Sequence, residues 1–71
     1  MVQTSFDTLA NGLAESGQTG LLNVLMSSDW HDGGDLENLR YMADEVYDLS
    51  EVDTANLDAF IDSCYEVGLA V

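Results

Sequence analysis

The chain has 71 residues, 46% of them hydrophobic, and carries fourteen acidic residues against one basic residue, which gives a formal net charge of −13 at pH 7. This length suits a single small domain, and no run of about 18 apolar residues predicts a membrane span. The near absence of Lys and Arg excludes direct nucleic-acid binding, and the single cysteine, Cys64, excludes an intrachain disulfide.

The first predicted helix covers residues 5–16, where apolar side chains recur at steps of three and four. Thr4 and Asp7 have the spacing of a capping box at its start, and Gly17 suits the left-handed position after its end. Gly12 lies inside this helix, at a cost of up to about 1 kcal/mol relative to alanine. The apolar positions are Phe6, Leu9, Ala10, Leu13 and Ala14.

The second predicted helix is short and almost wholly apolar, over residues 20–28, with Thr19 as its N-cap. Its leucine and methionine content and the flanking glycines favour helix, although a run this short also fits a buried strand. Because the segment lacks a clear polar face, we expect it to be buried between the other helices.

Residues 29–35 form a predicted loop, and Asp35 is the predicted N-cap of a third helix that extends to Leu49. Apolar residues again recur at steps of three and four along this helix. They are Leu36, Leu39, Met42, Ala43, Val46 and Leu49.

The fourth predicted helix covers residues 54–67, after a second capping-box turn from Ser50 to Asp53 and before a terminating Gly68. Its apolar stripe consists of Leu57, Phe60, Ile61, Cys64 and Val67. The four segments together predict an all-α fold, a small compact four-helix bundle that forms one domain over residues 1–71, with two acidic helices in the C-terminal half.

Twelve of the fourteen acidic residues lie between Asp29 and Glu66. Carboxylates four residues apart lie about 6 Å apart along a helix axis. Like charges at this spacing destabilise a helix by roughly 0.2–0.5 kcal/mol per pair, yet no lysine stands between them. We therefore predict that they bind a partner. The predicted partner-binding residues are Glu37, Asp44, Glu45, Asp48 and Glu51 on the third helix and Asp58, Asp62 and Glu66 on the fourth.

Two acidic helices side by side would present two rows of negative charge, as duplex DNA does with one charge per about 3.4 Å of axis on each strand. A basic groove attracts any rigid array of anions, and carboxylates accept arginine forks much as phosphates do. Aromatic side chains interleaved with the acids suit the anchors of such an interface. These are Trp30, Tyr41, Tyr47 and Tyr65. The pattern predicts a protein that occupies a basic, nucleic-acid-binding surface of another protein.

In size, charge and lack of lysine, most of the chain resembles the small acidic nucleic-acid mimics made by phages and mobile elements. These include anti-CRISPR proteins, anti-restriction proteins and the uracil-DNA glycosylase inhibitor. The resemblance is one of character and involves no sequence motif, so it transfers no functional residue. Among these classes it favours an anti-CRISPR protein, which implies a DNA-mimic inhibitor of a CRISPR effector in the cytosol of a host cell.

The loop that starts at Asp29 has one feature of a calcium-binding EF-hand, a glycine at the sixth position. His31 and Gly33 stand where oxygen ligands are required, and Arg40 stands in place of the final glutamate. No motif places a nucleophile with His31. We therefore expect no metal site and no catalytic histidine in this segment.

Two other chemically distinctive residues favour structural roles. Cys64 lies on the apolar stripe of the last helix, which predicts a core thiol rather than a reactive one. Arg40 is predicted to pair locally with Glu37 or Asp44 on its own helix. We expect no enzyme activity and no cofactor, because a chain this short rarely forms a catalytic cleft.

Two alternative functions fit the same charge. The chain could be an adaptor for some other basic protein. It could also be a domain adapted to high salt, since such surfaces are poor in lysine and richer in aspartate than in glutamate, here nine against five. Residues 1–5 show neither a basic cluster nor an apolar stretch of signal-peptide type, so we expect a cytoplasmic protein with no membrane partner.

Overall fold

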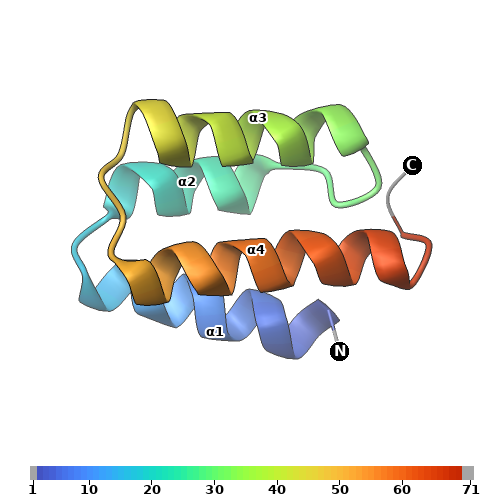
Figure 1. Cartoon of the computed structure of the whole chain (residues 1–71), viewed down its shortest axis with the longest axis horizontal. Coiled ribbons are helices and arrows are strands. Elements are labelled where there is room, and N and C mark those ends of the chain that lie inside the picture. The colour runs from blue at the N-terminus through green and yellow to red at the C-terminus, as the bar shows by residue number, and fades with distance from the viewer. Residues whose placement is uncertain (1, 70–71) are drawn as a thin grey trace.

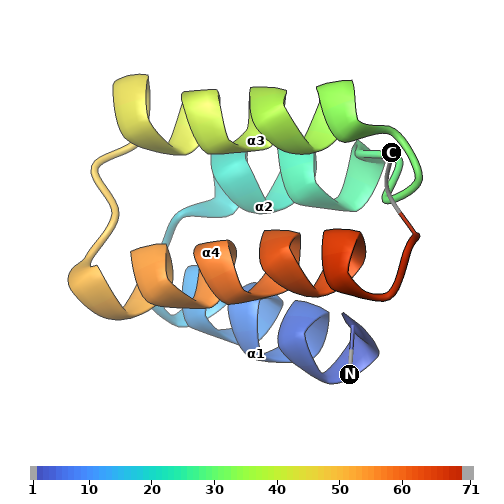
Figure 2. The same cartoon turned by 45° about the vertical axis from the view of Figure 1, so that its right-hand side comes forward.

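The computed structural model describes residues 2–69, and four helices account for most of them. They are α1 (Val2–Glu15), α2 (Thr19–Ser27), α3 (Gly33–Glu45) and α4 (Glu51–Glu66). Successive helices run antiparallel, and each packs against two neighbours, in the order α1, α2, α3, α4 and back to α1 (Figure 1 and Figure 2). The predicted all-α four-helix bundle is confirmed, and the segment predicted at residues 20–28 forms a helix, Thr19–Ser27, rather than a strand.

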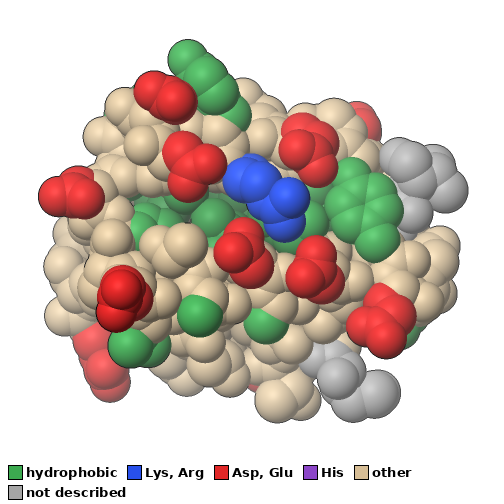
Figure 3. All heavy atoms as spheres, viewed as in Figure 1, with side chains coloured by type: hydrophobic (Ala, Val, Ile, Leu, Met, Phe, Trp, Pro, Cys, Tyr) green, Lys and Arg blue, Asp and Glu red, His purple; other side chains and the backbone are tan. Residues whose placement is uncertain are grey.

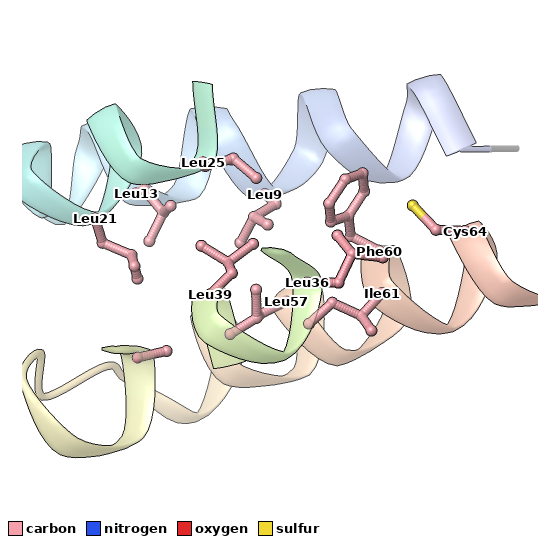
Figure 4. Packing of buried hydrophobic residues seen from close by; sticks show 11 residues of the cluster. Leu9, Leu13, Leu21, Leu25, Leu36, Leu39, Leu57, Phe60, Ile61 and Cys64 are labelled. Carbon is pink, nitrogen blue, oxygen red and sulfur yellow. The ribbon is translucent and has the colours of Figure 1, made fainter. Parts of the chain in front are cut away.

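The hydrophobic core lies along the centre of the bundle and takes side chains from every helix (Figure 4). Its members are Leu9 and Leu13 of α1, Leu21 and Leu25 of α2, Leu36, Leu39 and Ala43 of α3, and Leu57, Phe60, Ile61 and Cys64 of α4. Complete burial of a leucine contributes roughly 1.5–3 kcal/mol relative to leaving it exposed. Apolar burial, spaced at three and four residues along each helix, therefore holds the four helices together.

An aromatic cluster fixes the loop between α2 and α3 to the bundle. The ring of Trp30 lies 4.8 Å from that of Phe6 in α1 and 5.3 Å from that of Phe60 in α4, centroid to centroid. Phe6 and Phe60 are themselves 5.8 Å apart in an edge-to-face arrangement. Such pairs contribute about 0.5–1.5 kcal/mol each beyond the area they bury, so the loop before α3 has a fixed position.

The predicted capping box of the first helix is wrong. α1 already begins at Val2, whose side chain packs against the core, so Thr4 lies inside the helix. The Thr8 hydroxyl donates to the carbonyl of Thr4, and Asp7 accepts a hydrogen bond from the Gln3 amide. The apolar contact of Val2 extends the helix by one turn beyond the local capping signal.

The N-caps predicted for α2 and α3 are also displaced. Thr19 is the first residue of α2, and the residue before it makes no side-chain capping bond. Asp32, rather than Asp35, caps α3, because its carboxylate accepts a hydrogen bond from the backbone N–H of Gly34 at 2.8 Å. The Asp35 carboxylate instead accepts from the backbone N–H of Asp29.

The cap residues predicted at the remaining helix ends are confirmed, but the fourth helix begins at Glu51 rather than at residue 54, because Ser50 itself is its N-cap. Ser50 precedes α4, and its hydroxyl accepts a hydrogen bond from the backbone N–H of Asp53 at 3.2 Å. Gly17 and Gly68 both adopt φ of +75°, after α1 and α4 respectively. That left-handed conformation favours glycine, because a side chain there would clash with the backbone.

The third helix is shorter than predicted. It ends at Glu45 rather than Leu49, where the carbonyl of Met42 accepts hydrogen bonds from the N–H groups of both Val46 and Tyr47. Val46, expected on the apolar face, is 58% exposed. Tyr47 and Leu49 pack against the core from the connection instead.

Met26 and Val67, which were expected on buried faces, also lie at the surface. Met26 is 65% exposed, because α2 packs only against α1 and α3 and its remaining face points outward. The prediction that this segment is buried between the other helices therefore holds only for the face of α2 that carries Leu21 and Leu25. Val67 is 60% exposed and follows the end of α4.

Gly12 permits a close approach between α1 and α4. Asp53, in the first turn of α4, is 3% exposed, and its Oδ2 accepts a hydrogen bond from the Ser16 hydroxyl at 2.6 Å. A Cβ atom at Gly12 would lie 2.7 Å from Oδ1 of Asp53, closer than such atoms normally come. The glycine therefore makes room for a buried carboxylate that joins the two helices.

Candidate interaction surface

α3 and α4 lie side by side on one face of the bundle and display most of the predicted partner-binding acids (Figure 1 and Figure 3). Apart from Glu51, the first residue of α4, the exposed acids of these helices are Glu37, Asp44 and Glu45 from α3 and Asp58, Asp62 and Glu66 from α4. Glu37 and Asp44 are seven residues apart and share a side of α3, while the α4 acids follow one another at steps of four. We call these two sets, without Glu45, the acidic rows.

Asp48 and Glu51 were predicted to lie on the third helix, but α3 ends before both of them. Asp48 lies in the connection between α3 and α4, and Glu51 is the first residue of α4, where a negative charge interacts favourably with the helix dipole. Both side chains are exposed. The predicted row along α3 therefore ends at Asp44, and these two acids extend the negative surface around one end of the bundle.

A shallow groove of about 470 Å³ lies between the acidic rows. It is lined by Arg40 and Asp44 of α3 and by Thr54, Leu57, Asp58 and Asp62 of α4. Figure 3 shows apolar atoms along the seam between the helices, with acidic side chains on both sides and the single blue cation, Arg40, over it. Carboxylates around a partly apolar groove can accept the edges of a cationic side chain while its stem contacts the floor.

Arg40 was predicted to pair with an acid of its own helix, but it pairs with two acids of α4 instead. Its Nη2 lies 3.7 Å from Oδ1 of Asp58 and 3.9 Å from Oδ1 of Asp62. All three side chains are at least one third exposed, so each pair contributes only about 0.2–1 kcal/mol. The pairing crosses between helices because Arg40 lies at the edge of α3 that packs against α4.

Five other acids accept hydrogen bonds from within the chain. Asp53 is bound by Ser16, Asp32 caps α3, Asp29 and Asp35 order the loop before α3, and Asp7 accepts from a neighbouring glutamine. None of the eight predicted partner-binding carboxylates accepts a hydrogen bond within residues 2–69. The acids thus divide into a set that stabilises the fold and a set that faces solvent.

Of the four aromatic residues proposed as interface anchors, two pack against the core and two are exposed. Trp30 and Tyr47 pack against the core, which removes them from the predicted surface. Tyr41 in α3 is 60% exposed and Tyr65 in α4 is 40% exposed, so both can contact a partner. The Tyr65 hydroxyl donates to the carbonyl of Gly33 at 3.4 Å, which restrains its ring beside the N-terminus of α3.

His31 and Cys64 are both outside the acidic rows. The Nδ1 of His31 lies 3.1 Å from the carbonyl oxygen of Leu69, as in a hydrogen bond donated by the ring. Cys64 is fully buried, and burial raises the pKa of its thiol, which keeps it protonated at neutral pH. Across residues 2–69, no three potential His, Cys, Asp or Glu ligands form a metal-binding group.

The sequence contained a signal for the bridge between Arg40 and α4 that local pairing rules missed. Arg40 follows the core residue Leu39, and Asp58 follows the core residue Leu57. Both charged residues therefore border apolar stripes, and stripes that pack together bring their borders into contact. The buried position of Asp53 had no comparable signal, because its spacing from Ser50 predicts only an exposed capping turn.

Comparison with known proteins adds no relative from which function could be inferred. No family model, no curated protein and no solved structure matches the chain. None of the helices in the described part of the chain is long and apolar enough to cross a membrane. The charge and geometry of the α3–α4 face are therefore the basis for a functional proposal.

Proposed function

We propose that this chain is a non-enzymatic inhibitor that binds the basic nucleic-acid-binding groove of another protein through its α3–α4 face. One observation carries the proposal. Two adjacent helices display acidic rows whose carboxylates accept no hydrogen bond within residues 2–69, and only two of them, Asp58 and Asp62, pair with a cation there, Arg40. A partner that supplies many cations would satisfy them together.

Electrostatics makes the basic groove the best match for this face. The self-repulsion of clustered Lys and Arg in such a groove is relieved by a rigid array of anions, and a helix pair is rigid. Carboxylates accept arginine forks in the same bidentate way as phosphates. The exposed rings of Tyr41 and Tyr65 add apolar contact area on the same two helices.

We further propose that the target is a host defence protein such as a CRISPR effector. Effectors of this kind hold nucleic acid in positively charged channels and recognise its backbone shape. The resemblance in size and charge to phage-made nucleic-acid mimics supports this class of target, which would place the chain in the cytosol of a host cell. An adaptor for another basic partner is the alternative.

Competition with DNA tests the proposal directly. A purified CRISPR effector loaded with guide RNA is bound to a fluorescein-labelled target duplex, and the chain is added while fluorescence anisotropy is recorded. We expect the labelled duplex to be excluded, with an apparent affinity for the chain that falls as salt concentration rises. An effector that binds the chain and keeps its DNA would support the adaptor function, and one that does not bind the chain is not its target.

A matched pair of variants distinguishes the acidic rows from net charge alone. The variants E37Q/D44N, in the α3 row, and D7N/E15Q, in α1, each take the formal charge from −13 to −11. We expect E37Q/D44N to weaken competition, mainly by slowing association, and D7N/E15Q to do much less. Circular dichroism checks that both remain helical. Equal loss in the two variants would contradict a binding role for the rows.

A further inference from the structure

Arg40 is the only Lys or Arg in the chain, and it lies in the groove between the acidic rows. A cation in this place repels a basic partner and lowers the net negative charge. Electrostatic attraction by itself would favour a neutral residue there. The position of Arg40 therefore calls for a role that outweighs this effect.

The ion pairs of Arg40 join the two helices that carry the rows. Its guanidinium reaches from α3 to Asp58 and Asp62 of α4, at 3.7 and 3.9 Å. Asp44 of α3 lines the same groove as these two aspartates, so without a cation the carboxylates of the two helices repel one another across it. The Nε of Arg40 is buried and has no hydrogen-bond acceptor within residues 2–69, where the ion pairs of the guanidinium are with α4 alone.

We propose that Arg40 is a positioning residue that holds Asp58 and Asp62 toward α3 and so fixes the separation of the two acidic rows presented to a partner. The inference rests on the proposed function. Net charge alone predicts that removal of Arg40 strengthens binding to a basic partner, whereas a positioning role predicts that it weakens binding. Removal of the cation makes the chain more negative and should speed association, yet the misplaced carboxylates should let the complex dissociate faster.

The test compares R40M with N38D. Each takes the formal charge from −13 to −14, but N38D changes an exposed residue of α3 and leaves the ion pairs of Arg40 in place. Binding to the guide-loaded effector is measured by surface plasmon resonance. We expect slightly faster association for both variants. We expect dissociation about two- to fivefold faster for R40M alone, the size of effect that loss of an exposed ion pair gives. R40K, which keeps the charge, should restore most of the wild-type dissociation rate.

The same variants give a readout on the free protein. The side-chain carboxyl carbon shifts of Asp58 and Asp62, measured by NMR at neutral pH, should change in R40M and stay unchanged in N38D. Melting temperatures check folding, and R40Q replaces R40M in every comparison if R40M does not fold. Equal dissociation rates for R40M and N38D, or unchanged Asp58 and Asp62 shifts in R40M, would overturn the positioning role. A wild-type chain that fails to displace DNA defeats the proposed function instead, and the NMR result then decides the role of Arg40.

Discussion

At the scale of single residues, Asp53 behaves differently from every other acid whose surroundings the structure describes. It is buried, while the remaining acids are exposed or partly exposed. A buried carboxylate is tolerated when hydrogen bonds replace its lost hydration, and the Ser16 hydroxyl supplies one at 2.6 Å. Gly12 supplies the space, because it has no Cβ atom to meet the carboxylate. These three residues join the end of α1 to the start of α4.

Replacement of Gly12 by alanine should destabilise the protein, although the same change in an exposed helix stabilises by up to about 1 kcal/mol. The new methyl group would lie 2.7 Å from Oδ1 of Asp53 and force the carboxylate away from Ser16. Loss of that charge-assisted hydrogen bond costs roughly 1.5–3 kcal/mol, which exceeds the gain in helix propensity. Urea unfolding of G12A should therefore show a lower midpoint than wild type.

A double variant isolates the cause. In a D53A background the carboxylate is gone, and the nearest remaining side-chain atom is Nδ2 of Asn56, at an ordinary 3.7 Å from the added methyl group. G12A should then stabilise the protein relative to D53A alone, as helix propensity predicts. The same sign of effect in both backgrounds would show that contact with Asp53 is not what makes Gly12 necessary.

At the scale of helices, the residue at which a helix begins depends on both the local capping pattern and the contacts of nearby side chains with the core. Thr4 and Ser50 both precede an aspartate by three residues, and both predict a capping box. Only Ser50 caps a helix, because Val2 reaches the core and carries α1 past Thr4. An identical local pattern therefore has two outcomes in one chain.

Alanine substitutions at Thr4 and Ser50 should show that Ser50 caps its helix and that Thr4 does not. S50A removes the acceptor for the backbone N–H of Asp53 and should lower the free energy of unfolding by about 1 kcal/mol. T4A removes no cap and replaces threonine by a better helix former, so it should leave stability unchanged or raise it by less than about 1 kcal/mol. Urea denaturation of both variants measures the difference. A T4A variant as unstable as S50A would mean that Thr4 caps α1 in solution.

At the scale of the whole molecule, a small apolar core holds together a surface of high negative charge. The radius of gyration is 10.8 Å, so at low salt, where the Debye length is about 30 Å, most pairs of charges lie within one Debye length of each other. The core favours the compact state, and the net charge of −13 opposes it. Stability should therefore depend on ionic strength more than it does in a protein of balanced charge.

The melting temperature at pH 7 should rise as NaCl increases from low to physiological concentration, because shortening the Debye length from about 30 to about 8 Å screens the repulsion. The E37Q/D44N variant, with two fewer charges, should show a smaller rise. Differential scanning fluorimetry measures both. A melting temperature that falls or stays constant would contradict crowded charge as a destabilising force. A requirement for molar salt before the chain folds would favour the high-salt interpretation.

The sequence alone predicts the four helices, the composition of most of the core and the exposure of the eight partner-binding acids. These features depend on the spacing of residues within one segment. Leu36, Leu39 and Ala43 of α3, for example, lie on the same side of the helix because of their steps of three and four, whichever helices pack against it. The left-handed conformations of Gly17 and Gly68 at the ends of their helices were also predictable, because such a turn has a strong local preference for glycine. The partner-binding role of the acids stays a prediction.

Only the tertiary structure decided which residues meet across helices. It selected Asp58 and Asp62 rather than Glu37 or Asp44 as partners of Arg40, buried Asp53 against Gly12, and drew Trp30 and Tyr47 into the core. The physical reason is the same in each case. Several local arrangements differ by only about 1 kcal/mol, and burial of apolar area between helices contributes more than that, so packing chooses among them.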